Sequence, residues 1–389
     1  MMTEPINPQN LADFADLQTP ALLLDLSIVD ANTARLRQHL ARVAPDILHR
    51  PHLKTAKSTD IAEHVLAGQR RAITVSTLRE AEEFAAIGIN DILFAVGIVP
   101  SKLERVLALR EAGIDLKIIV DNVAMAKEIA RFSREKSSPI PTLIEIDCDG
   151  HRSGVKSSDA AMIAAIAASL EDGAEMAGVM THAGGSYDAS SAAQIARAAT
   201  SEVTEITRSA RILRDAGFEV PIVSLGSTPT ALSVQDLSGV TEVRAGVYMF
   251  FDLVMSGLRV CPVEAIALSV LTTVIGHQPD KGWIIVDAGW MAMSRDRGTA
   301  SQELDQGYGL VCDQSGKPCD DLIMISANQE HGIITARPGS TASLPDIAVG
   351  DQLRILPNHA CSTAAQHDRY HVLDTDNGVK AIWPRFNGW

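Results

Sequence analysis

The sequence lacks the features that would place the protein in a membrane, in a secretory pathway or on nucleic acid. No apolar run approaches the length of a transmembrane helix. Residues 1–20 are polar and acidic, without the basic start and apolar core of a signal peptide. The formal net charge is −14 at pH 7 and no basic stripe is present, which argues against a nucleic-acid partner.

Cysteine is also scarce. The five cysteines are odd in number and scattered, at Cys148, Cys261, Cys312, Cys319 and Cys361. This pattern is typical of reduced thiols rather than of a disulfide framework, so we expect a cytoplasmic protein. No Gly-x-Gly-x-x-Gly motif follows an early strand, and this absence disfavours an open doubly wound sheet.

The chain does contain enough residues for two domains, because 389 residues are too many for one small core. Short apolar runs then alternate with amphipathic stretches, and we expect helices at 27–43, 79–87, 102–112, 123–132 and 190–216. The expected strands number eight, the count that closes a parallel barrel. They cover residues 49–54, 72–78, 92–96, 117–121, 142–147, 175–183, 222–227 and 241–248.

The pattern of apolar and polar residues changes after about Val260. Residues 265–275, 283–287, 332–336 and 352–356 are β-like and are separated by Gly, Pro and Asp. A further strand is expected at Ala21–Leu26, outside the count of eight. The sequence therefore predicts an α/β protein with two domains. These are a (β/α)8 barrel over residues 27–258 and a mostly β domain formed by 1–26 plus 259–389.

Reactive groups gather at the C-terminal ends of the strands in a parallel barrel. Lys54 ends the first expected strand, His182 the sixth, and Gly226-Ser227-Thr228 the seventh. A strand-end lysine can form a Schiff base with pyridoxal phosphate, although most such lysines only cap a strand. The Gly-Ser-Thr turn offers backbone N–H groups and hydroxyls that suit a phosphate, with an ordinary polar turn as the alternative.

Further polar residues lie near the same predicted rim. Arg244, in Arg244-Ala245-Gly246-Val247-Tyr248, can donate to a pyridine nitrogen or form a rim salt bridge. Arg152 can reach a phenolate oxygen or stay in solvent, and His182 and Tyr187 are weaker candidates. Near the C-terminus, His359 and Cys361 lie two residues apart. On an extended segment their side chains point the same way, so one metal ion can bind both, although such a pair is usually incidental.

Taken together, these segments resemble the alanine-racemase-like (fold-type III) pyridoxal-phosphate enzymes, and within them the D-serine dehydratase and D-threonine aldolase branch. The likeness covers about Thr19 to Trp389. It rests on Arg50-Pro51-His52-x-Lys54, Glu145-Ile146-Asp147, Val286-Asp287-Ala288-Gly289, Glu330-His331-Gly332 and Pro357-Asn358-His359-Ala360-Cys361.

The resemblance implies roles for individual residues. Lys54 would hold pyridoxal 5'-phosphate and then take the Cα proton, while His359 and Cys361 would bind a divalent metal, either zinc, manganese or magnesium. His331 is either a contact of the metal or substrate, or a structural residue. A homodimer is expected from the same likeness. The expected cofactor-binding set is Lys54, Arg152, His182, Tyr187, Gly226, Ser227, Thr228, Arg244, Gly246 and Val247.

The activity implied by the resemblance is a dehydratase that converts a D-configured β-hydroxy amino acid into a 2-oxo acid and ammonia. D-threo-3-hydroxyaspartate is the first expected substrate and D-serine the second. The family aldolases usually carry His-Cys-Asp where this chain has His359-Ala360-Cys361, and this difference favours the dehydratase. Two alternatives remain: a retro-aldol lyase on the same scaffold, and a non-enzymatic pyridoxal-phosphate carrier.

Overall fold

The computed structural model describes residues 17–342, 344–373 and 378–389. The chain divides into two compact units, one formed by Ala34–Gly246 with Gly388–Trp389 and the other by Met1–Thr33 with Val247–Asn387. We call them the barrel unit and the β unit. Residues 1–16 of the predicted β domain lie outside the described residues, and its predicted boundaries stay a prediction.

The barrel unit is built on parallel strands. Eight of them follow one another in the order β2-β10-β9-β8-β6-β5-β4-β3. A parallel bridge between His52 and Thr74 joins the segment after β2 to β3, so the sheet is a nearly closed barrel, which confirms the predicted (β/α)8 architecture. The strands are β2 (Leu48–His49), β3 (Ala72–Val75), β4 (Asp91–Gly97), β5 (Asp115–Val120), β6 (Pro141–Asp147), β8 (Glu175–Thr181), β9 (Ile222–Leu225) and β10 (Glu242–Val243), with β7 (Val155–Lys156) beside β6.

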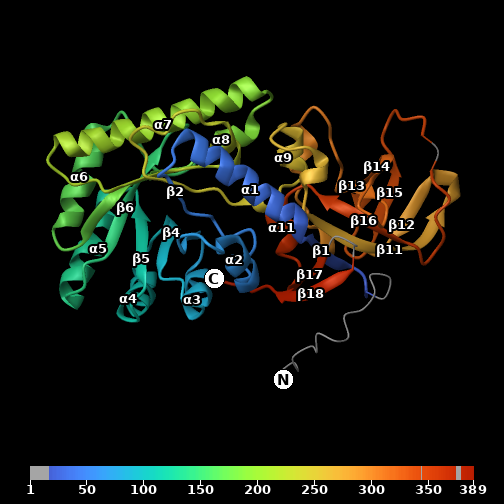
Figure 1. Cartoon of the computed structure of the whole chain (residues 1–389), viewed down its shortest axis with the longest axis horizontal. Coiled ribbons are helices and arrows are strands. Elements are labelled where there is room, and N and C mark those ends of the chain that lie inside the picture. Colours follow the sequence, from blue (N-terminus) through green and yellow to red (C-terminus); the bar gives the residue numbers. More distant parts are fainter. Residues whose placement is uncertain (1–16, 343, 374–377) are drawn as a thin grey trace. The chain divides into compact units, whose positions relative to one another are not determined.

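Helices alternate with these strands and lie along the outside of the sheet (Figure 1). Several begin where a side chain accepts the first free backbone N–H groups. Thr77 accepts from Glu80, and Asn122 accepts from Met125 at 2.9 Å. The helices are α1 (Leu26–Val43), α2 (Thr59–Leu66), α3 (Leu78–Ala86), α4 (Leu103–Glu111), α5 (Val123–Lys136), α6 (Ala160–Glu171), α7 (Ala192–Asp215) and α8 (Thr228–Ser233).

The β unit holds the second sheet, in the order β12-β15-β14-β13-β16-β11-β1-β17-β18. Because β12 also pairs with β11, six of these strands form a closed ring from which β1, β17 and β18 continue. The strands are β1 (Ala21–Asp25), β11 (Leu268–Gln278), β12 (Trp283–Val286), β13 (Gly309–Cys312), β14 (Pro318–Ala327), β15 (Gly332–Ala336), β16 (Gln352–Pro357), β17 (Arg369–Leu373) and β18 (Val379–Pro384). Short helices connect them, including α9 (Leu253–Gly257), α10 (Trp290–Met293) and α11 (Ala360–Ala364).

The first barrel strand is shorter than the predicted span of 49–54. The regular ladder covers Leu48–His49, followed only by the bridge at His52. Pro51 explains the interruption, because it accepts from Thr74 through its carbonyl but has no N–H to donate. Lys54 therefore lies in a turn beyond the strand rather than on its last residue.

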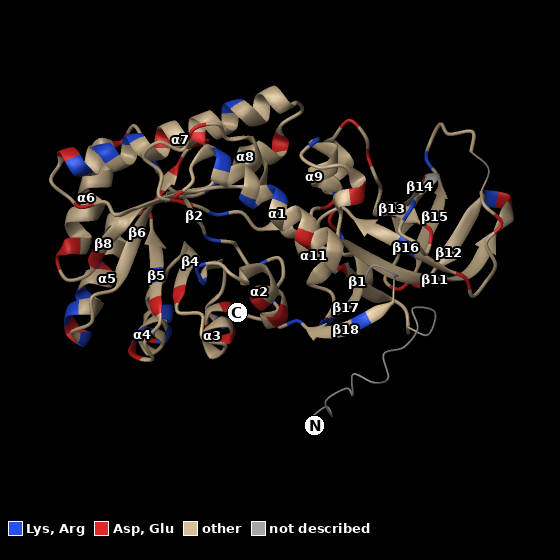
Figure 2. Cartoon of the chain, viewed as in Figure 1, with Lys and Arg blue, Asp and Glu red and all other residues tan. Residues whose placement is uncertain are grey.

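Charged residues are distributed over both units. Figure 2 shows basic and acidic residues interspersed along the helices and loops that it draws. None of the helices in the described part of the chain combines the length and the apolar character that crossing a membrane requires.

Candidate active site

Lys54 lies at the rim of the barrel unit, in the turn that follows the His52–Thr74 bridge, and its side chain is half-buried. No hydrogen bond or ion pair to its Nζ is found among the described residues. Lys57, three residues later, differs in this respect: its Nζ lies 3.4 Å from the buried carboxylate of Glu80, and its φ is +45°. Of the two lysines, Lys54 is the one whose amine the fold leaves available.

Burial and the positive groups predicted from the sequence lower the pKa values of two neighbouring histidines, His52 and His182. Burial lowers the pKa of His52, and Lys54 and Arg244 lower it further. Burial also lowers the pKa of His182 to about 3, with Arg152, Lys54 and Arg244 adding to the effect. Charges act this strongly only over short distances. The structure therefore brings Lys54, Arg152, His182 and Arg244 together at one rim.

His182 is held in a defined protonation state. Its Nδ1 lies 2.9 Å from the carbonyl oxygen of Gly226, which can only accept a hydrogen bond. Nδ1 therefore carries the proton, and Nε2 of the neutral ring is left as an acceptor. Tyr187 lies beside it, with ring centroids 6.3 Å apart. Both side chains are half-buried.

The Gly226-Ser227-Thr228 turn uses part of its own hydrogen-bonding capacity. The N–H of Gly226 donates to Glu202 and the N–H of Ser227 donates to Thr230, each at 3.1 Å. Two of the backbone N–H groups that the turn was expected to offer are therefore taken, one by a tertiary contact and one by a capping contact. Thr228 differs, since its Oγ1 is buried and has no partner in the described structure.

Close backbone approach explains two glycines at this rim. Gly226 has a φ of +133°, and a Cβ there would lie 2.2 Å from the carbonyl oxygen of Arg244. A Cβ on Gly246 would lie 2.8 Å from the carbonyl oxygen of His52. The next residue, Val247, is buried and begins a short 3-10 helix. A side chain at Gly246 would therefore displace the segment that leads to Lys54.

The two arginines occupy different environments. Arg244 is buried, and it donates from Nε to Ser224 at 2.7 Å and from its terminal nitrogen to the carbonyl of Thr181. Arg152 is exposed in the loop after β6. Beneath that loop, burial raises the pKa of Glu145, which accepts a hydrogen bond from Ser153.

These features fit pyridoxal phosphate. A half-buried lysine has an unpaired amine, and a buried threonine hydroxyl has no partner, which is rare in folded proteins unless a ligand or water satisfies it. Glycines at 226 and 246 allow the close approach of backbone segments that forms this rim. Lys54 would hold the carbonyl carbon of the cofactor, and Thr228 would contact its phosphate.

The proposed metal ligands lie in the β unit. His359 is the N-cap residue of α11, and Cys361 lies in the first turn of that helix. The predicted extended geometry was therefore wrong, because a helix starts between the two residues. The side chains still interact, since a hydrogen bond joins His359 to Cys361. The first turn of α11, and not the alternating side chains of a strand, therefore brings His359 and Cys361 together.

Carboxylates orient this pair. The Nδ1 of His359 lies 2.8 Å from Oδ2 of Asp296, which also accepts from Ser362. Buried Asp252 accepts the N–H of Ala360 at 3.0 Å and so holds the start of α11. Burial opposes protonation of His359, but Cys361, Asp296 and Asp252 together raise its pKa to about 11.

This donor set suits a metal with few protein ligands. With Nδ1 held by Asp296, the His359 ring presents Nε2, and the Cys361 thiolate is the second donor. No group of three or more His, Cys, Asp or Glu side chains in the described residues is arranged to hold a metal ion. The two-ligand pattern leaves other coordination positions for substrate and water, as catalytic sites require.

Two residues of the recognition motifs have simpler roles. Asp287 accepts hydrogen bonds from Thr272 and from the backbone of Thr273, so it ties the end of β12 to the middle of β11. His331 is exposed in the turn between β14 and β15, and its carbonyl accepts from Asn328.

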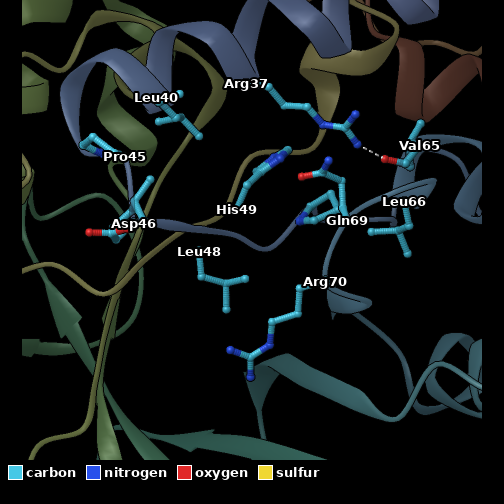
Figure 3. A pocket seen from close by; sticks show the side chains of 13 residues that line it. Arg37, Leu40, Pro45, Asp46, Leu48, His49, Val65, Leu66, Gln69 and Arg70 are labelled. Carbon is cyan, nitrogen blue, oxygen red and sulfur yellow. Dashed lines mark hydrogen bonds between the residues drawn. The ribbon is translucent and has the colours of Figure 1, made fainter.

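A cavity of about 410 Å³ lies in the barrel unit between α1, β2 and α2 (Figure 3). Its lining combines the apolar Leu40, Leu48 and Leu66 with Arg37 and Arg70. None of the cofactor-binding residues predicted from the sequence lines it. The cavity is therefore separate from the rim that carries Lys54.

Three residues near these groups were not singled out from the sequence. His52 belongs to a recognition motif but has no pattern of its own, and Asp296 follows an irregular segment. Glu202 did carry a signal, because it falls on the apolar stripe of the helix predicted at 190–216.

Comparisons with known proteins agree with this arrangement. Residues 24–254 match the family described as alanine racemase, N-terminal domain, and residues 267–373 match the putative serine dehydratase domain. The chain is 50% identical over 378 residues to D-threo-3-hydroxyaspartate dehydratase of Delftia sp. strain HT23, covering 96% of this chain and 98% of that protein. It is 28% identical to D-serine dehydratase of Dictyostelium discoideum, with 95% and 97% covered.

Aldolases are more distant relatives. The 3-hydroxy-D-aspartate aldolase of Paracoccus denitrificans strain Pd 1222 is 26% identical, with 96% of this chain and 92% of that protein covered. Among solved structures, the Delftia dehydratase superimposes with a TM-score of 0.93 at 50% identity, covering 97% and 100% of the two chains. A cysteine-to-alanine variant of D-threo-3-hydroxyaspartate dehydratase in the metal-free form gives 0.94 at 49% identity, with the same coverage.

Proposed function

Since this chain belongs to the alanine racemase N-terminal domain family and carries a serine dehydratase domain, we propose that it is a pyridoxal-phosphate-dependent lyase acting on D-configured β-hydroxy amino acids. The proposed reaction removes water from D-threo-3-hydroxyaspartate and gives oxaloacetate and ammonia, with D-serine as a second substrate that gives pyruvate. One observation carries the proposal: among the described residues the Lys54 amine has no hydrogen-bond or ion-pair partner, and in the same unit the buried Thr228 hydroxyl has none either.

The residues of the barrel unit supply binding and proton transfer. Bound pyridoxal phosphate would delocalise the electrons released when the Cα–H bond of the substrate breaks. The Lys54 amine is available to take that proton, since no acidic side chain pairs with it in the described structure. Neutral His182 offers Nε2 as an acceptor, and buried Arg244 keeps a positive charge beside it. Tyr187, Ser227 and Gly246 extend the proposed surface around the cofactor, with Arg152 at its edge. Val247, the next proposed cofactor residue, is the first residue of the second segment of the β unit.

The residues of the β unit would hold the metal. His359 through Nε2 and Cys361 through its sulfur are the proposed ligands, and a divalent ion between them would stabilise the departing hydroxide as a Lewis acid. Zinc, manganese and magnesium are candidates, and the thiolate favours zinc. The metal-free form of the relative's cysteine-to-alanine variant supports a cysteine ligand.

A retro-aldol lyase is the second candidate, because D-threonine aldolase of Filomicrobium marinum superimposes with a TM-score of 0.81 at 25% identity, covering 98% of both chains. The 50% identity to a dehydratase favours elimination. The match of residues 267–373 to a dehydratase domain argues against a carrier that consists of a barrel alone.

The proposal extends to the protein's location and assembly. None of the five cysteines forms a disulfide in the structure, which fits the reducing cytoplasm. A homodimer is proposed from the family resemblance, and light scattering of the purified protein would measure its mass.

Product analysis tests the activity. The purified enzyme, loaded with pyridoxal phosphate and zinc or manganese, is incubated with D-threo-3-hydroxyaspartate, and ammonia, oxaloacetate and glyoxylate are assayed. We expect equal amounts of ammonia and oxaloacetate, and no products from Lys54→Ala. Glyoxylate with glycine would identify an aldolase instead, and the absence of all products would favour the carrier. Parallel reactions with D-serine and D-threonine define the accepted β-substituent.

A further inference from the structure

Glu202 is a buried acid on the apolar side of α7. Its neighbours on that side of the helix are Ile195, Ala199, Ile206 and Leu213, all buried, and Glu202 itself is 1% exposed. Burial of a carboxyl group is costly unless its oxygens find hydrogen-bond donors. An apolar residue would pack at this position without that penalty, so the carboxyl requires an explanation.

The carboxyl group reaches two loops at once. Its Oε1 accepts the N–H of Ala183 at 2.9 Å and the N–H of Gly226 at 3.1 Å. Ala183 follows β8, and Gly226 follows β9, so these are neighbouring loops at the same end of the barrel. The other oxygen, Oε2, is buried and has no partner in the described structure. Both hydrogen bonds thus depend on one oxygen atom.

The same two loops carry the residues proposed to surround the cofactor. His182 precedes Ala183 and donates from Nδ1 to the carbonyl of Gly226 at 2.9 Å. Ser186, in the first loop, lies 2.9 Å from the hydroxyl of Ser227, in the second. Glu202 therefore joins the two loops from beneath, while His182 and Ser186 join them at the rim.

The shared oxygen also acts on His182. Glu202 accepts the N–H of Gly226, and the carbonyl oxygen of the same residue accepts from Nδ1 of His182. By holding Gly226 in place, Glu202 therefore also fixes the carbonyl that sets the tautomer of His182. Burial raises the pKa of Glu202, which favours the neutral acid. A neutral carboxyl group keeps its carbonyl oxygen as an acceptor, so an amide of the same shape can replace it.

We propose that Glu202 is a positioning residue that holds the loops after β8 and β9 in the arrangement that receives the cofactor, by accepting N–H groups from both with one oxygen. The inference rests on the proposed function, because it takes pyridoxal phosphate as the ligand of these loops. Glu202 itself touches neither the cofactor nor the substrate in this account. Because Glu202 holds the two loops in place beforehand, less conformational entropy is lost when pyridoxal phosphate binds.

Three substitutions separate geometry from charge. Glu202→Gln keeps an oxygen at the same reach but cannot ionise, Glu202→Asp keeps an ionisable carboxyl group but shortens the reach, and Glu202→Ala removes the acceptor. Glu205→Gln, one turn along α7, is the matched control, because its carboxylate accepts from Ser157 instead of from the two loops. Circular dichroism and the melting temperature establish that each variant is folded.

The measurements are the dissociation constant of pyridoxal phosphate from titration of the apoprotein, the visible absorbance maximum of the bound cofactor, and hydrogen exchange of the two loop segments. For Glu202→Ala we expect cofactor affinity to fall by about 10- to 100-fold, since two buried N–H groups lose their acceptor. Exchange should accelerate in residues 183–187 and 226–230 together. Glu202→Gln should stay close to wild type, Glu202→Asp should resemble Glu202→Ala, and Glu205→Gln should change nothing.

Two results would overturn the inference. One is a folded Glu202→Ala variant with unchanged cofactor affinity and unchanged exchange in both loops. The other is an equal loss in Glu202→Gln and Glu202→Ala, which would assign the effect to charge rather than to the accepting oxygen. Failure of the wild-type protein to bind pyridoxal phosphate would refute the proposed function instead, and the exchange data on Glu202→Ala would still decide whether the two loops depend on this residue.

Discussion

Single residues at the barrel rim differ in what the fold leaves for them to bind. Lys54 and Lys57 are three positions apart, yet only Lys57 has a carboxylate partner, at Glu80. That carboxylate also accepts from the backbone and hydroxyl of Ser76, so its position is set by the start of α3. Lys57 is thereby held for a structural purpose, and the amine of Lys54 stays available for chemistry.

Replacing each lysine tests this distinction. Lys54→Ala should lose the visible absorbance of the covalently held cofactor, because no other amine takes its place. Lys57→Ala should keep the absorbance and lose only the ion pair with Glu80. Because this leaves a buried carboxylate without its cation, we expect a lower melting temperature. Absorbance spectra and a peptide map after borohydride reduction are the measurements, and label found on Lys57 would contradict the assignment.

The same argument applies to the proposed metal ligands. Cys361→Ala removes the thiolate and should lower ammonia release roughly a thousandfold or more, because several kcal/mol of leaving-group stabilisation are lost. The absorbance of the bound cofactor should survive, since Lys54, Thr228 and Arg244 lie in the other unit. Metal content by elemental analysis and ammonia release are measured together, with Cys319→Ala as the cysteine control.

Chelation of the wild-type enzyme should reproduce the Cys361→Ala result and be reversed by adding the metal. Cys361→Asp offers the oxygen ligand of the aldolase type, and we expect weaker elimination, with any gain in glycine as a sign that the ligand biases the reaction. Full activity of metal-stripped wild type would remove the metal from the proposal and return His359 and Cys361 to a structural role.

At the scale of elements, the rim is built by loops that approach one another through glycine. The segment after β10 passes so close to the end of β2 that a Cβ on Gly246 would lie 2.8 Å from the carbonyl oxygen of His52. That distance is too short for unstrained packing, and the displaced segment is the one that continues to Lys54. Helix α7 acts through Glu202 on the neighbouring loops after β8 and β9, so the geometry of the rim depends on both sets of contacts.

Gly246→Val should weaken cofactor binding by about tenfold or more, because overpacking of this kind costs ~1–3 kcal/mol and falls beside the cofactor residues. Gly276→Val, in β11, is the control, since a Cβ at Gly276 meets nothing within 4 Å. Titration of the two apoproteins with pyridoxal phosphate gives the comparison. Unchanged affinity in Gly246→Val would place the phosphate elsewhere.

At the scale of the whole molecule, the barrel closes over a buried ionic network. Arg50 follows β2 and donates to Asp91 on β4 at 2.7 Å and to Glu242 on β10 at 2.8 Å. Lys117 on β5 contacts Asp91 at 3.0 Å. Because β2 and β3 are joined only by the bridge at His52, these ion pairs link strands around the seam where the regular ladder is missing.

Acid should weaken this network in a defined range. Burial would raise the pKa of Asp91, but Arg50 and Lys117 lower it to about 2. The unfolded value is about 3.9. A lowered pKa in the folded state adds stability above the unfolded value, and that stability is lost as the pH falls from about 4 to about 2. The shift corresponds to about 2–3 kcal/mol of unfolding free energy.

Asp91→Asn should therefore destabilise the protein by about 2–3 kcal/mol at neutral pH, and the difference from wild type should shrink below about pH 4. Urea unfolding followed by circular dichroism at several pH values measures it. Asp115→Asn is the control, because this more exposed partner of Lys117 should contribute less than ~1 kcal/mol. A difference that does not vary with pH would show that Asp91 acts through packing rather than through its charge.

The sequence alone determined the architecture and the principal chemical groups. Apolar periodicity predicted eight barrel strands with intervening helices, because a buried strand or helix face requires apolar residues at regular, local spacings in the sequence. The surroundings of Lys54 and the His359-Ala360-Cys361 pair were recognised as motifs for the same reason, since each lies within a few residues of chain. The assignment of these residues to cofactor and metal remains a proposal that the experiments above test.

Only the tertiary structure decided how those groups are held. Pro51 shortens the first strand, a helix begins between His359 and Cys361, and the N–H of Gly226 is already taken by Glu202. Glu202 lies 24 positions from Gly226 in the chain, and its contact depends on how α7 rests against the barrel. Hydrogen bonds between segments far apart in the chain produce no regular spacing of residues in the sequence. They are fixed only when packing sets the register of one element on another.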